Sequence, residues 1–158
     1  GMARVMDATT LTDREAKQML EALARWPILR LPTFSVGDDI AISLNGAAGP
    51  PLIRVRAGVS TTLRMRLETR GPARYDATAV LPHWTKDKTV GWILTLGVKD
   101  TRTLLASTTA PPVIGSGRAT IRFTIPAEKK GAMDLTLFVQ SDCLLGVDQE
   151  YLIKALVQ

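Results

Sequence analysis

The chain has 158 residues, of which 46% are apolar and 22% charged, with 20 Lys and Arg against 15 Asp and Glu. This length fits one domain, and the apolar fraction excludes a wholly disordered chain. No apolar run approaches the roughly 20 residues of a membrane-spanning helix. A single cysteine, Cys143, excludes an intrachain disulfide and a cysteine-cluster zinc site. Gly1-Met2 is typical of a tag remnant, so we interpret residues 1–11 as a tag remnant and flexible lead.

The first predicted element is a helix over residues 12–26. Thr12 and Glu15 have the spacing of a capping box, in which each side chain accepts the other residue's backbone N–H. One apolar stripe follows at helical spacing, formed by Ala16, Met19, Leu20 and Leu23. Pro27 cannot continue the helix, which we therefore expect to end near Trp26.

After Pro27 the apolar pattern changes to the period of two that is typical of strands, with turn residues between the runs. We predict strands at Ile28–Ser35, Asp39–Leu44, Leu52–Arg56, Thr61–Arg70, Asp76–Val80, Trp92–Val98, Thr103–Ser107, Ala119–Ile125, Leu135–Gln140 and Tyr151–Val157. Many short alternating strands without helices between them predict an antiparallel β-sandwich over residues 27–158. Trp92 alternates with apolar residues along its strand and is predicted to lie in the core.

The excess positive charge is local. One segment holds six arginines and one acid, Glu68, and accounts for the whole formal net charge of +5. The arginines are Arg54, Arg56, Arg64, Arg66, Arg70 and Arg74. Between Leu63 and Glu68 charged and apolar residues alternate, so a strand there turns its arginines to water. We interpret this segment as a solvated outer sheet face, with a surface for RNA or for an acidic protein as the alternative.

Groups that carry catalysis are scarce in this sequence. The single histidine, His83, has no second ligand or base beside it, and Cys143 is expected to be a small buried residue. The pair Gly115 and Gly117 lacks the third glycine of a dinucleotide-binding motif and precedes a strand instead of a helix. The sequence therefore predicts no catalytic residue, no cofactor and no metal site.

The most distinctive stretch runs from Phe138 to Tyr151. It is predicted to be a strand, a loop and the last strand. Asp142 is expected to accept backbone N–H groups two residues further on, as in an Asx turn. Gly146 is expected to adopt a positive φ.

This stretch resembles the end of the Sec-sixty-three domain, whose last module is immunoglobulin- or fibronectin-III-like. Seven residues match its terminal motif at the same spacing, namely Ser141, Asp142, Gly146, Asp148, Gln149, Glu150 and Tyr151. Leu144 stands where the family has a tyrosine. A second block, from Gly91 to Ala106, is similar to the family's Gly-Trp-Trp-Leu strand and the strand after it, with Ile93 in place of the second tryptophan.

The resemblance implies an immunoglobulin-like or fibronectin-III-like sandwich without catalytic chemistry. Such modules occur in large Ski-two-like RNA helicases, above all the spliceosomal one, with a relative in an activating-signal-cointegrator helicase. They also occur in a J-protein of endoplasmic-reticulum translocation. The first setting implies a nuclear module of pre-mRNA splicing that supports the helicase and docks other spliceosomal proteins. It also implies that the N-terminal helix ends a preceding helical module.

We therefore expect a non-catalytic, monomeric fragment of an ATP-dependent RNA helicase, with no membrane contact. An RNA-contacting surface of such a helicase and the equivalent translocation module remain the alternatives.

Overall fold

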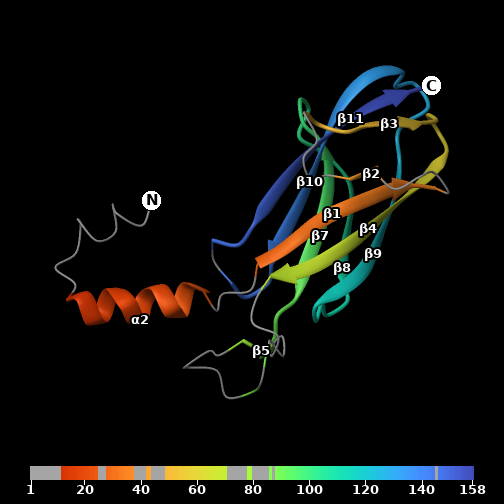
Figure 1. Ribbon diagram of the computed structural model, residues 1–158. Coiled ribbons are helices and arrows are strands. Elements are labelled where there is room, and N and C mark those ends of the chain that lie inside the picture. The colour runs from red at the N-terminus through yellow and green to blue at the C-terminus, as the bar shows by residue number, and fades with distance from the viewer. Residues whose placement is uncertain are drawn as a thin grey trace.

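The computed structural model describes residues 12–24, 28–37, 42–43, 49–70, 78–79, 86, 88–144 and 146–158. Within these residues the chain forms one helix, two sheets that face each other and a small two-stranded sheet. The predicted all-β sandwich with a short N-terminal helix is confirmed (Figure 1). His83, Arg74 and the predicted helix end at Trp26 lie outside the described residues, as do residues 1–11.

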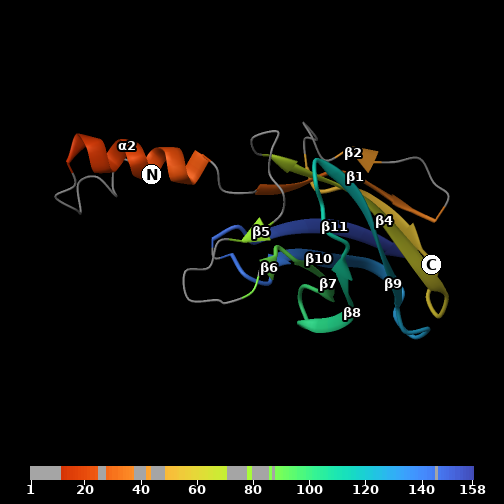
Figure 2. The same cartoon turned by 90° about the horizontal axis from the view of Figure 1, so that it is seen from below.

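The helix α2 (Asp13–Ala24) begins as predicted. The Glu15 carboxylate accepts the Thr12 backbone N–H at 2.8 Å, and the Thr12 hydroxyl accepts the Glu15 N–H at 3.4 Å. The Thr12 backbone N–H and the Thr12 hydroxyl, which donates to the same carboxylate at 2.7 Å, hold the pKa of Glu15 below its usual value. On the apolar stripe Ala16 is buried, but Met19 and Leu20 are about two-fifths exposed at 38% and 43%. Figures 1 and 2 show α2 standing apart from both sheets, so its stripe has no described partner.

The first sheet contains four strands with antiparallel pairing throughout. Its order is β2 (Ile42–Ser43), β1 (Ile28–Val36), β4 (Ser60–Arg70) and β9 (Ser116–Thr124). The register of β1 against β4 shifts between Arg30 and Thr33. Pro32 lies in this bulge, where its missing N–H interrupts no regular ladder bond.

The second sheet contains five strands and lies against the first, as Figure 2 shows from below. Its order is β3 (Leu52–Val55), β11 (Gln149–Val157), β10 (Gly131–Ser141), β7 (Trp92–Val98) and β8 (Thr103–Ala110). The small sheet pairs β5 (Thr78–Ala79) with β6 (Lys88–Thr89). The order β1-β4-β9 facing β11-β10-β7-β8 corresponds to strands A-B-E and G-F-C-C′ of an immunoglobulin-like sandwich.

One pairing differs from the predicted antiparallel arrangement. β3 pairs in parallel with β11, from Leu52 beside Lys154 to Val55 beside Val157. Parallel neighbours need a long connection, and here most of the chain separates the two strands. A pattern of alternation reports which face of a strand is buried but not which neighbour the strand takes, so this pair was not foreseeable.

The core lies between the two sheets and is built from the alternating apolar positions. Trp92 is 2% exposed on β7, the strand in the place where immunoglobulin domains carry their buried tryptophan. The prediction that Trp92 lies in the core is confirmed. Its largest fully buried companions include Phe34, Leu63, Met65, Leu67, Leu94, Leu96, Ile121, Leu135 and Leu137.

Most predicted strands are present but differ at their ends. β7 has the predicted bounds, whereas β10 begins at Gly131 instead of Leu135 because its ladder with β11 continues to the pair Gly131 and Val157. Backbone hydrogen bonds do not require apolar alternation, so the pattern missed this extension. β6 was not predicted, and parts of the strands expected at Asp39–Leu44 and Asp76–Val80 lie outside the described residues. No described helix is both long and apolar enough for a bilayer crossing.

Candidate functional site

The carboxylate of Asp142, just after β10, contacts a segment more than 50 positions earlier in the chain. Its Oδ1 accepts the Gly91 backbone N–H at 2.8 Å, and its Oδ2 accepts the Lys88 ammonium at 2.5 Å. The Asp142 backbone N–H donates in turn to the Gly91 carbonyl at 3.0 Å. The two blocks that carry the family resemblance pair along β7 and β10, and this ladder ends in the reciprocal contact between Gly91 and Asp142.

Ser141 and Asp148 shape the loop that follows. The Ser141 hydroxyl accepts the backbone N–H groups of Cys143 at 3.3 Å and of Leu144 at 3.1 Å. The Asp148 carboxylate accepts the Ser141 N–H at 3.0 Å and so closes the loop. The predicted Asx turn is wrong in its acceptor, because Ser141 takes the Leu144 N–H while Asp142 points to Gly91. The Ser141 side chain therefore stabilises the loop, whereas the Asp142 side chain binds the segment from Lys88 to Gly91.

Gly146 lies in the same loop with a φ of 78°, so the predicted positive φ is confirmed. L-residues with a Cβ rarely adopt this conformation. A Cβ added at Gly146 would meet no atom within 4 Å, so the requirement for glycine comes from the backbone alone.

Gln149 and Tyr151 connect β11 to the opposite sheet. The Gln149 amide donates to the Leu29 carbonyl on β1, and its oxygen accepts the Tyr151 hydroxyl. Burial of the half-buried Tyr151 raises the pKa of its phenol, while a backbone bond with Leu31 and the charge of Arg30 oppose that rise. These two motif residues thus tie the last strand to the first strand of the sandwich.

The negative charge of Asp142 is paired with the positive charge of Lys88. Burial opposes its ionisation, but the bonds from Lys88 and Gly91 and the Cys143 thiol together hold the pKa of Asp142 below its usual value. The hydrogen bond to Asp142 raises the pKa of Lys88. Cys143 is half-buried instead of fully buried as predicted, and burial and Asp142 raise the pKa of its thiol. A raised thiol pKa opposes formation of the nucleophilic thiolate.

The polar side chains of the terminal motif therefore have structural partners. Ser141, Asp142, Asp148, Gln149 and Tyr151 all use their polar atoms in bonds within the protein. In the described part of the chain no group of three or more His, Cys, Asp and Glu residues gathers where it could hold a metal ion. These hydrogen bonds connect the end of β10 to the start of β7, and β11 to β1 of the opposite sheet.

The arginines predicted as one patch fall in different places. Arg64 and Arg66 lie exposed on β4, with Leu63, Met65 and Leu67 buried on its other side, as the alternation predicts. Arg54 lies on β3, at the edge of the other sheet, and Arg56 is the first residue after that strand. The side chain of Arg70 and all of Arg74 lie outside the described residues.

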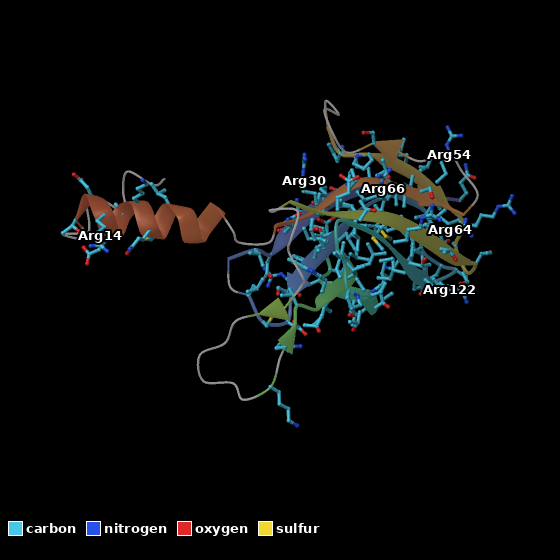
Figure 3. The ribbon with its side chains drawn as sticks, turned by 60° about the horizontal axis from the view of Figure 1, so that its bottom comes forward. Arg14, Arg30, Arg54, Arg64, Arg66 and Arg122 are labelled. Carbon is cyan, nitrogen blue, oxygen red and sulfur yellow. The ribbon has the colours of Figure 1, made fainter. Side chains whose placement is uncertain are left out.

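The structure brings other arginines beside Arg64 and Arg66. Arg66 stands directly opposite Arg118 on β9, and Arg122 lies on the same strand opposite Thr62. Arg30 enters from β1 opposite Glu68. Figure 3 shows Arg30, Arg66, Arg64 and Arg122 spread along the β1–β4–β9 sheet. The alternation of Arg118, Thr120 and Arg122 signals an outward strand face in the sequence, but only strand pairing places it beside β4.

Comparison with known proteins relates this chain to two large proteins. No family model matches the chain. It is 29% identical over 94% of its length to activating signal cointegrator 1 complex subunit 3 of Gallus gallus, of which the match covers 7%. It is 40% identical over 49% of its length to the Rattus norvegicus protein of that name, with 4% of that protein covered. The match to an Arabidopsis thaliana DExH-box ATP-dependent RNA helicase, DExH14, is 34% over 62% of this chain and 4% of the helicase.

The chain is homologous to a segment of these larger proteins. It spans only 4–7% of the length of these relatives. The expected kinship with large RNA helicases is thereby supported at this coarse level. The assignment to a Sec-sixty-three domain and to the spliceosome remains a prediction.

Proposed function

We propose that this chain is a non-catalytic β-sandwich module of a Ski-two-like ATP-dependent RNA helicase, supporting its parent and docking protein partners. The homology to short segments of much longer proteins supports the parent class. The helix α2 would then continue a preceding helical module, in keeping with its exposed Met19 and Leu20. Splicing, a nuclear location and spliceosomal partners belong to the same proposal, as the terminal motif implies them.

The observation that carries a docking role is an apolar hollow on the outer face of the second sheet. Its volume is about 540 Å³, and its lining includes Leu104 and Phe138, with Lys99, Arg102 and Glu150 at polar positions. Leu104 is 62% exposed, and Phe138 is 37% exposed. Ile93, on the neighbouring β7, exposes a further large apolar side chain.

A surface of this kind suits a protein partner. Apolar side chains at the centre with charged groups around them are typical of protein–protein interfaces. The occupant we propose for this hollow is an apolar segment of the parent helicase. The terminal motif contributes by fixing β10, which carries Phe138, against β7 and β11.

The test is association in trans between this chain and the rest of its parent helicase, measured by isothermal titration calorimetry. Phe138→Asp with Leu104→Asp is expected to weaken binding at least tenfold. Val59→Asp with Ile114→Asp changes two exposed apolar turn residues outside the hollow and serves as the matched control. Undiminished binding of the first variant would contradict the docking surface, and ATP hydrolysis by the pure chain would contradict a non-catalytic role.

A further inference from the structure

The outer face of the first sheet consists of arginines and hydroxyl side chains. β1, β4 and β9 each turn alternate residues away from the core, and the bulge at Pro32 shifts this alternation on β1 by one residue. The described outward residues are Arg30, Thr33, Ser35, Ser60, Thr62, Arg64, Arg66, Glu68, Ser116, Arg118, Thr120, Arg122 and Thr124. We call this set the arginine face. It carries five arginines and a single carboxylate.

The charges on the arginine face repel one another. Arg66 and Arg118 are direct cross-strand partners, and like charges in that position destabilise a sheet. Glu68 forms an ion pair with Arg66 at 3.1 Å. Within the described ranges no carboxylate forms an ion pair with Arg118 or Arg122. Arg64 donates a hydrogen bond to the Gly37 carbonyl at 2.7 Å, which helps to hold its side chain in place. The juxtaposition of Arg66 and Arg118, by contrast, is not explained by the stability of the sheet.

The geometry of the face suits a chain of evenly spaced anions. Directly opposite residues of neighbouring strands have Cβ atoms about 5 Å apart, and residues two apart on one strand are separated by about 7 Å. A shallow hollow of about 320 Å³ lies over its centre, lined by Arg64, Arg66, Arg118, Thr33 and Thr120 among others. Arginine and hydroxyl side chains are the usual donors to phosphate oxygens. We propose that the arginine face binds the phosphodiester backbone of an RNA strand.

The composition of the face favours RNA over an acidic protein. Protein interfaces have a core with aromatic, Met or other apolar anchors. None of the exposed large apolar side chains in the described chain belongs to the arginine face, and most of them lie in turns or on the other sheet. The face also offers no described aromatic ring on which a base could stack. It therefore contacts phosphates and does not read base identity.

Fluorescence anisotropy with labelled oligouridine tests the proposal. Arg66→Gln with Arg118→Gln is expected to weaken binding at least tenfold at about 50 mM salt, and to reduce the slope of log K against log salt by about 1.4. Lys99→Gln with Lys154→Gln removes the same charge from the second sheet and its turn, and should leave both quantities nearly unchanged. Loss of affinity in equal measure in both variants would overturn the proposal, because it would show binding by net charge alone.

A variant that removes a negative charge from the arginine face, and is therefore expected to strengthen binding, completes the test. Glu68→Gln removes the one carboxylate of the face and frees Arg66, so it should strengthen oligouridine binding several-fold. Oligoadenosine should bind as tightly as oligouridine, because only phosphates are contacted. Absence of oligouridine binding at about 50 mM salt would overturn the proposal. So would saturable binding of polyglutamate that excludes RNA and is lost in the Arg66→Gln/Arg118→Gln variant.

Discussion

Gly91 and Asp142 fit together so closely that any side chain at position 91 would displace the Asp142 carboxylate. A Cβ added at Gly91 would lie 2.4 Å from Oδ2 and 2.8 Å from Cγ of Asp142. The carboxylate holds this position because it accepts the Gly91 N–H and the Lys88 ammonium. The glycine that opens one block of the family resemblance and the aspartate near the start of the other are thus halves of one contact.

Replacing Gly91 with Ala should destabilise the sandwich by about 1–3 kcal/mol, since the carboxylate must swing away and give up its bonds. Urea denaturation measures the free energy of unfolding. Gly117→Ala is the matched control, because its Cβ would meet only Val113, at 3.4 Å. In a double-mutant cycle with Asp142→Ala, the Gly91 substitution should cost little extra. Full additivity of the two changes would contradict the contact.

Asp142 should make stability depend on pH in the acid range. Its pKa is lower in the folded state than in the unfolded state, so the unfolded chain binds the proton first as pH falls. The contribution is present above the unfolded pKa and is lost as pH falls through the folded pKa. Asp142→Asn should therefore flatten the loss of stability between about pH 5 and pH 2, measured by urea denaturation. A profile in which Asp142→Asn keeps the full loss of stability in acid would contradict this role of the carboxylate.

Gly146→Val should lower the free energy of unfolding by about 1–3 kcal/mol, because a β-branched residue is strained at a φ of 78°. Gly146→Asn should cost clearly less, since asparagine tolerates this left-handed conformation. Thermal unfolding followed by circular dichroism compares the two. Equal losses would show that the cost comes from contacts of the new side chain instead of from the backbone.

Gln149→Ala should destabilise the protein by about 1–3 kcal/mol, because it removes the side-chain donor to the Leu29 carbonyl and the side-chain acceptor of the Tyr151 hydroxyl. Tyr151→Phe keeps the ring and removes only the hydroxyl, so it should cost less than Gln149→Ala. Gln140→Ala, exposed on β10, is the control and should be nearly neutral. A neutral Gln149→Ala variant would mean that this link between the two sheets contributes nothing to stability.

The alternating pattern predicted much of the fold because it is a local property. In β4 the buried Leu63, Met65 and Leu67 and the outward Arg64 and Arg66 follow from the pleat alone. The capping box of Thr12 and the positive φ of Gly146 are equally local, since each depends on a few neighbouring residues. For the same reason the sequence could place Trp92 in the core without knowing what lies opposite it.

The candidate sites depend on contacts between residues distant in sequence, and there the sequence was a weaker guide. Grouping arginines by their place in the chain joined Arg54 to Arg64, although β3 and β4 belong to different sheets. The same reasoning gave Asp142 a local acceptor role that Ser141 fulfils. Residues brought together by strand pairing, such as Arg66 and Arg118, share no short sequence pattern that would reveal them.

By itself, then, the sequence determined that this is one β-sandwich domain whose one net excess of charge lies in a single arginine-rich segment. The tertiary structure decided how that charge is used, because pairing of β4 with β9 and β1 adds Arg118, Arg122 and Arg30 to Arg64 and Arg66. It also decided that Gly91 and Asp142 meet. The physical reason is that side-chain alternation is set within one strand, whereas strand order and register are set by the packing of the whole sandwich.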